Sequence, residues 1–158
     1  ELVKVKGISE NSATLIKTVQ AAACMMLKEQ MSERPVLNSW QALLDYLHLS
    51  MAYEQREQFR VMFLNRRNEL ISDEVQQTGT VDHTPVYPRE ILKRALEIGA
   101  TAIILVHNHP AGDPEPSTSD IEMTKEIIRA TAPLEIVVHD HLIIGKSGTT
   151  SFKSMGLI

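Results

Sequence analysis

The chain lacks the features that mark several large classes of protein. It contains a single cysteine, Cys24, so no disulfide can form within it, and a reducing cytoplasm is the expected compartment. No run of about 18 apolar residues could span a bilayer. The first residues, from Glu1 to Gly7, show neither an initiator Met nor a signal peptide. We therefore expect a soluble cytoplasmic protein that does not enter a membrane and is trimmed from a longer chain.

An excess of positive charge is also missing. The 16 Lys and Arg residues against 20 Asp and Glu residues give a net charge of −4, whereas a domain that mainly holds phosphates is expected to be basic. The negative charge lowers the expectation of nucleic-acid binding without excluding it. Seven basic residues would form a local patch only if their elements lay side by side: Arg56, Arg60, Arg66, Arg67, Arg89, Lys93 and Arg94. Scattered, solvated charges are the simpler interpretation.

What the chain does contain is the composition of one ordinary globular domain. Its 158 residues are 43% hydrophobic and 23% charged, which is close to the average for globular domains. Apolar residues recur at helical spacing from Ser9, a plausible cap, to about Met31, and predict a helix with one buried stripe. Pro35 then interrupts this pattern. We expect a short N-terminal region with a linker at residues 1–34 and the main domain at residues 38–158.

The main domain alternates helical and strand patterns. Asn38 with Gln41 resembles a capping pair for its first helix, Pro88 suits the first turn of another, and Gly99 suits a left-handed helix end. The expected elements are a helix at 39–56, a hairpin of strands 58–64 and 70–75, a helix at 88–98, a strand at 101–106, a helix at 118–131, and strands 134–138 and 142–144. The order predicts an α/β fold, a mixed sheet with helices on both faces.

Two histidines and an aspartate indicate a metal site. His107 and His109 end the continuously apolar strand, where side chains two residues apart point to the same side. Asp120 falls in the first turn of the following helix, and the intervening loop can fold that turn back over the strand end. Two histidines and one carboxylate, with an open fourth position, are the ligands of a catalytic zinc site. Asp113 and Glu115 are alternative carboxylates.

The spacing of these residues resembles a known signature. His107-Asn108-His109, seven residues and Ser117-Thr118-Ser119-Asp120 match the H-x-H-x7-S-x-x-D pattern of the JAMM (MPN+, JAB) metallo-hydrolases. Within that group the chain resembles the RadC family from about Asn38 to Ile158, through Gly79-Thr80-Val81-Asp82, Pro88-Arg89-Glu90, His109-Pro110, Gly112-Asp113, Pro116-Ser117 and Asp140-His141. The resemblance implies a three-layer, cytidine-deaminase-like JAB/MPN architecture. It also implies a Zn²⁺-dependent hydrolase that cleaves a peptide or isopeptide amide in a protein substrate, and it selects Asp120 as the third ligand.

The same resemblance assigns two further roles. Ser117 would hydrogen-bond the developing oxyanion or the attacking water, while its position before a helix also suits an N-cap. A glutamate placed just before the first strand would act as general base. Glu57 stands at that position, and the other glutamates considered for the role are Glu54, Glu69, Glu74 and Glu90.

Other patterns keep rival functions open. Lys6-Gly7-Ile8-Ser9 followed by Ala13 resembles the second half of the helix-hairpin-helix that precedes the metal domain in RadC-like proteins, which suggests a DNA-repair or DNA-transaction accessory that binds DNA weakly. A non-catalytic MPN binding module is a third possibility. A second H-x-H, His139-Asp140-His141, has no carboxylate at useful spacing, so we expect it to lean on the first site. The sequence leaves the substrate, the native metal and the oligomeric state open.

Overall fold

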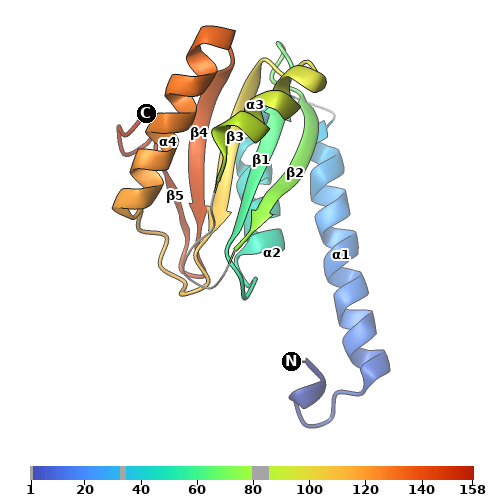
Figure 1. Ribbon diagram of the computed structural model, residues 1–158. Coiled ribbons are helices and arrows are strands. Elements are labelled where there is room, and N and C mark those ends of the chain that lie inside the picture. Colours follow the sequence, from blue (N-terminus) through green and yellow to red (C-terminus); the bar gives the residue numbers. More distant parts are fainter. Residues whose placement is uncertain (1, 33–34, 80–85) are drawn as a thin grey trace.

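The structure is a computed structural model that describes residues 2–32, 35–79 and 86–158. The predicted linker residues Glu33 and Arg34, the motif residues Thr80 to Asp82, and His83 lie outside the described residues. One mixed sheet runs in the order β2-β1-β3-β4-β5 (Figure 1). Its strands are β1 (Gln58–Leu64), β2 (Leu70–Thr78), β3 (Ala102–Asn108), β4 (Val137–Ile144) and β5 (Thr149–Ser151). Strands β3 and β4 pair in parallel, and the other neighbours are antiparallel.

Helices cover both faces of this sheet (Figure 1). The helices are α1 (Glu10–Ser32), α2 (Trp40–Met51), α3 (Pro88–Glu97) and α4 (Thr118–Thr131). All residues of β3 are buried, and they alternate between two cores. Ile104 and Val106 pack with α2 and the end of α1, whereas Ile103 and Leu105 pack with α3 and α4. The predicted three-layer α/β fold is confirmed, and the end of β3 lies at the centre of the sheet.

The predicted ends of α3 are also confirmed. Pro88 occupies the first helical position, where its missing N–H costs nothing. Ile91 and Ala95 are buried against the sheet. Gly99 follows the helix with a φ of 67°, a conformation that glycine adopts without strain from a Cβ. This tight exit leads the chain directly into β3.

The C-terminal strands differ from the prediction. The two short strands expected at 134–138 and 142–144 are one continuous strand, β4. The register slips beside His139, because Ile103 pairs with Val138 while Ile104 pairs with Asp140. This bulge absorbs the polar His139 without ending the strand. Leu134 instead ends a 3-10 turn, and Glu135 turns the chain with a φ of 54°. The short edge strand β5 was not predicted.

The second helix is shorter than predicted. Helix α2 ends at Met51 rather than near Arg56, and the residues after it form a polar connection to β1. The expected capping pair is wrong, since a 3-10 turn, Val36–Ser39, precedes α2 and Ser39 occupies the N-cap position without a side-chain hydrogen bond to the first amides of the helix. Glu57 lies in this connection, immediately before β1.

The buried stripe predicted for the first helix is confirmed only in part, because Ala13 is buried and Ala23 and Leu27 are half-buried while the other predicted residues are exposed. Ser9 caps α1 as expected, because its Oγ accepts a hydrogen bond from the Ser12 amide. However, Val19 and Met26 are 62% and 64% exposed. The C-terminal part of α1 packs into the core beside α2 through Met31 and the partly buried Cys24 and Leu27, and Figure 1 shows its N-terminal part projecting beyond the domain. None of the helices in the described ranges is long and apolar enough to cross a membrane.

Candidate metal centre

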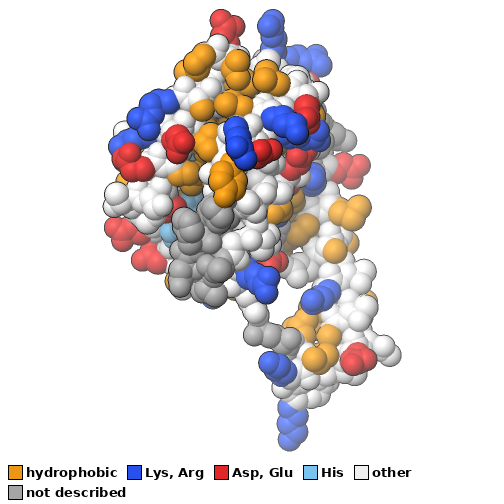
Figure 2. All heavy atoms as spheres, in the orientation of Figure 1, with side chains coloured by type: hydrophobic (Ala, Val, Ile, Leu, Met, Phe, Trp, Pro, Cys, Tyr) orange, Lys and Arg blue, Asp and Glu red, His pale blue; other side chains and the backbone are white. Residues whose placement is uncertain are grey.

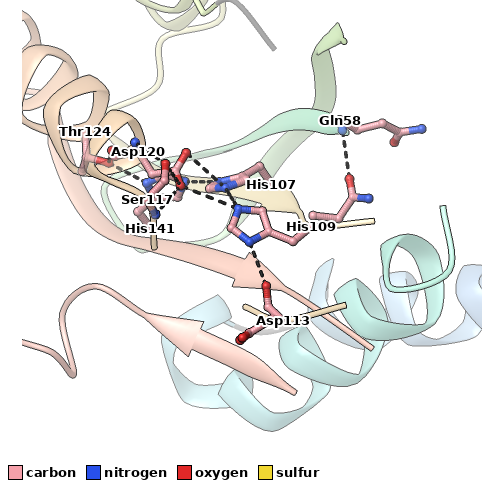
Figure 3. A network of polar contacts seen from close by, with 9 residues as sticks. Gln58, His107, His109, Asp113, Ser117, Asp120, Thr124 and His141 are labelled. Carbon is pink, nitrogen blue, oxygen red and sulfur yellow. Dashed lines mark hydrogen bonds and ion pairs between the residues drawn. The ribbon is translucent and has the colours of Figure 1, made fainter. Parts of the chain in front are cut away.

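Three predicted ligands meet where β3 ends. The ligand atoms of His107, His109 and Asp120 all lie within 4.8 Å of one another (Figure 3). The Nε2 atoms of the two histidines are 2.9 Å apart. Asp120 places Oδ1 3.4 Å from His107 Nε2 and Oδ2 3.6 Å from His109 Nε2. Two imidazole nitrogens and a carboxylate therefore face a single small space, so this group could hold a metal ion.

His109 is oriented by the loop that follows it. Its Nδ1 lies 2.8 Å from the Asp113 carbonyl oxygen, which can only accept, so Nδ1 donates and Nε2 is left for the metal space. The loop is held in turn by the β4–β5 connection, because the Ser147 hydroxyl donates to the Gly112 carbonyl. Gly145 is required in this connection, since a Cβ there would collide with the same carbonyl oxygen.

Asp120 is fixed by the start of α4. The Ser117 hydroxyl and amide both donate to Asp120 Oδ2, at 2.6 and 2.8 Å, and the Asp120 amide returns a bond to Ser117 Oγ. This reciprocal capping box satisfies helix-end donors that would otherwise lack partners. The N-cap alternative for Ser117 is therefore confirmed. Its hydroxyl also lies against the ligand carboxylate, and its role towards an oxyanion stays a proposal.

The charges of the site suit a cation. Burial alone would raise the pKa of the Asp120 carboxyl, but His107 and His109, whose Nε2 atoms lie 3.4 and 3.6 Å from its oxygens, hold that pKa well below its usual range. The hydrogen bond to Asp120 raises the pKa of His109 above its ordinary value, although burial opposes this. The ionised carboxylate thus favours positive charge between these side chains. A bound metal ion would supply that charge and displace the proton.

Glu57 lies beside this group. Strand β1 runs antiparallel to β3 with Phe59 opposite His107, so continuing the register by two residues brings Glu57 level with His109. Its carboxylate is near enough to contribute to the raised pKa of His109. Asn108, fully buried, accepts a hydrogen bond from the Gln58 amide at 2.9 Å and donates to the Arg56 carbonyl at 3.2 Å. The backbone on both sides of Glu57 is thus clamped to the strand that carries the histidines.

Replacing Asn108 by alanine is expected to loosen this clamp. Two part-buried backbone groups next to Glu57 would lose their side-chain partner, and each hydrogen bond lost is worth about 0.5–1.5 kcal/mol. We expect Asn108→Ala to lower the free energy of unfolding in urea, and to weaken any activity that needs Glu57 while the protein keeps its metal.

Asn65→Ala is the matched control for this variant. Asn65 also bonds two backbone groups, which are the amides of Arg67 and Glu69, but it lies in the turn at the far end of β1. The Asn65→Ala variant is expected to lower the free energy of unfolding without changing turnover. Equal losses of turnover in both variants would show that Asn108 acts only through general stability.

The other predicted glutamates and carboxylates are placed elsewhere. Three glutamates have partners away from the metal site, the pairs being Glu69 with Asn65, Glu74 with Arg94, and Glu90 with Arg89. Glu54 is exposed and lines a surface hollow with Lys17. Asp113 and Glu115 are exposed as well, and Asp113 serves the site through its backbone carbonyl rather than its side chain. Of the glutamates considered, Glu57 is the one that lies near the ligand residues.

The basic residues do not gather into a patch. Five of the seven form ion pairs, which are Arg60 with Asp73, Arg67 with Glu69, Arg89 with Glu90, Lys93 with Glu97, and Arg94 with Glu74. Figure 2 shows positive and negative side chains interspersed on the face that it presents. The prediction of scattered charges thus describes these residues better than a phosphate-binding surface.

Several residues of the site were not identified from the sequence. Thr124 lies one helical turn after Asp120, and its Oγ1 is 2.6 Å from His141 Nδ1. His141 Nε2 is in turn 2.8 Å from His107 Nδ1, so this part of the second H-x-H does lean on the first, while His139 bonds Asn68 instead. The sequence did hold one signal for Thr124: it is a polar residue four positions after Asp120, and therefore on the same face of the helix.

The family assignment agrees with this geometry. The family model described as RadC-like JAB domain matches residues 37–157. These residues include the whole sheet and all of the side chains that meet at the metal space. The chain belongs to the family of RadC-like JAB domains.

Proposed function

We propose that this domain is a metal-dependent hydrolase that uses water to cleave an amide, in a peptide or isopeptide bond. One observation supports this proposal most directly: three metal-ligating side chains converge beside Glu57, whose neighbouring backbone groups are hydrogen-bonded to Asn108. His107, His109 and Asp120 would hold the ion, and two histidines with one carboxylate favour Zn²⁺ in a catalytic rather than a structural site. Bound zinc would act as a Lewis acid and make a neighbouring water more acidic.

Two side chains of the protein would carry out the remaining steps of the reaction. The Glu57 carboxylate would accept a proton from the attacking water and return it to the leaving amide nitrogen. Ser117 is an exposed residue at the start of α4, and its hydroxyl is bonded to the Asp120 carboxylate. In the proposed reaction it turns to donate to the developing oxyanion, while its amide keeps its bond to Asp120.

A protein or peptide substrate fits the charge of the domain better than a nucleic acid. The net charge is −4, and five of the seven basic residues considered for a patch are already paired with acidic ones. Tight binding of nucleic acid requires many phosphates to be neutralised by unpaired Lys and Arg. We therefore propose that the domain binds DNA only weakly and non-specifically, with Kd no tighter than about 10⁻⁶ M at physiological salt.

A screen on three substrate classes tests the proposed function. The zinc-loaded protein is incubated with a peptide library, isopeptide-linked conjugates and supercoiled DNA, with and without a chelator, and DNA binding is titrated with salt. We expect slow, chelator-sensitive cleavage of some peptide or isopeptide and no nicking. Chelator-sensitive nicking with an intact peptide library would support the DNA-transaction function instead. If the fully metal-loaded protein cleaves none of the three substrates, the result would favour a binding module.

A further inference from the structure

A chain of three short hydrogen bonds connects two of the metal-site residues behind the site (Figure 3). It runs from His107 Nδ1 to His141 Nε2 at 2.8 Å and from His141 Nδ1 to Thr124 Oγ1 at 2.6 Å. It ends where Thr124 Oγ1 meets the Asp120 carbonyl oxygen, also at 2.6 Å. His107, His141 and Thr124 are almost completely buried, so water does not compete for these bonds.

The direction of the chain follows from counting hydrogens at its Thr124 end. Two oxygens 2.6 Å apart need a hydrogen between them, and a carbonyl oxygen has none to give. The hydroxyl of Thr124 has only one hydrogen, which must therefore point at Asp120. His141 must then supply the hydrogen of the contact between its Nδ1 and Thr124 Oγ1.

The same count continues to His107. A neutral imidazole carries one hydrogen, and in His141 it is on Nδ1, so Nε2 can only accept. The His141 ring lies against Phe59 and Phe152, with centroids 5.8 and 4.5 Å away, and such apolar surroundings disfavour a charged ring. His107 must therefore donate from Nδ1. Its Nε2 is left without a hydrogen, facing His109 and Asp120.

We propose that His141 and Thr124 are positioning residues that set the tautomer of His107, so that Nε2 is free to bind a metal ion. The reverse direction would put a hydrogen on His107 Nε2, where it blocks binding. Metal-ligating histidines usually donate to a carboxylate, a carbonyl or water. A neutral imidazole orients the ligand in this protein and adds no negative charge, so that Asp120 provides the only ligand charge. This inference rests on the metal site of the proposed function but not on any turnover.

Nitrogen NMR of the wild-type protein tests the tautomers without a substrate and without a variant. Long-range ¹⁵N–¹H spectra distinguish a protonated from an unprotonated ring nitrogen. We expect both His107 and His141 to carry their hydrogen on Nδ1 in the zinc-loaded protein, and His141 to do so in the metal-free protein as well. A hydrogen on His141 Nε2 in either state would overturn the proposal.

Two matched pairs of variants test the positioning role. Thr124→Val removes the hydroxyl at nearly constant shape, whereas Thr124→Ser keeps it. His141→Phe removes both ring nitrogens, whereas His141→Gln offers one acceptor and one donor. We expect Zn²⁺ affinity, measured by competition with a chelating dye, to fall about 10–100-fold in Thr124→Val and His141→Phe. Thr124→Ser and His141→Gln should restore most of it.

The outcomes separate this inference from the proposed function. Unchanged zinc affinity in folded Thr124→Val, checked by its amide NMR spectrum, would contradict the positioning role even if the protein is an active hydrolase. Expected tautomers and the expected loss and rescue of affinity would support it even if no substrate is ever cleaved. If the valine and phenylalanine variants do not fold, the wild-type tautomers still decide the matter.

Discussion

Asp120→Ala is expected to reduce the metal content of the purified protein from one ion per chain to nearly none. The variant removes the only carboxylate in the group that converges with His107 and His109, and two imidazoles alone are a weak site for zinc. His107→Ala should do the same, because His107 is the most deeply buried ligand. Elemental analysis of protein dialysed without chelator measures both.

Ser117→Ala is the matched control for Asp120→Ala, because Asp120 also takes part in the capping box of α4. Loss of an N-cap side chain costs about 1 kcal/mol of stability, but this variant keeps all three ligands and should keep its metal. Metal content near one per chain in Asp120→Ala would show that the ligand assignment is wrong. Metal lost equally from Ser117→Ala would mean that the capping box, rather than the carboxylate as ligand, controls binding.

Glu57→Gln is expected to keep the metal and to lose turnover by about a hundredfold or more, which is the usual size of general base catalysis. Glutamine preserves the shape of the side chain but cannot accept the proton of the attacking water. Glu57 is not one of the three residues that meet in the metal group, so zinc content should stay at one per chain. Turnover of the best substrate from the screen and elemental analysis are measured on the same sample.

Glu54→Gln provides the comparison for this variant. Glu54 lies three residues away in the same connection and is exposed, so its replacement changes charge without removing the proposed base, and turnover should be unchanged. Full activity of Glu57→Gln would give the role to another group. Loss of metal together with activity would instead make Glu57 a ligand.

The layers of the fold were predictable where hydrophobic periodicity was unambiguous. The continuously apolar strand at 101–106 could only be buried on both faces, and Pro88 and Gly99 marked the ends of a helix through their own backbone preferences. The failures lie where tertiary contacts decide. His139 looks like the end of a strand, yet a bulge lets β4 continue past it. The apolar residues of α1 fit a buried stripe, but the N-terminal part of that helix projects beyond the domain, and several of these residues stay exposed.

The residues of the candidate site also differ in how far the sequence alone could identify them. His107 and His109 were predictable because strand alternation places them on the same side, whereas Asp120 was selected over Asp113 and Glu115 by the resemblance to the JAMM signature. Asn108 and Thr124 were not identified, since an amide and a hydroxyl have many possible partners in a sequence and only the folded chain shows which ones they have. Glu57 falls between these cases, because its place depends on the register of β1 against β3, which the sequence alone leaves open.

Titrating Zn²⁺ into the metal-free protein while recording turnover tests the central claim most directly. Metal is removed with a chelator, zinc is returned in steps, and cleavage of the peptide or isopeptide substrate is measured against zinc bound per chain. If His107, His109 and Asp120 hold a single catalytic ion, activity is absent at the start, rises in proportion to bound zinc and reaches its plateau at one ion per chain. Cleavage that persists in the metal-free protein, or no cleavage of any amide at full loading, would contradict the account.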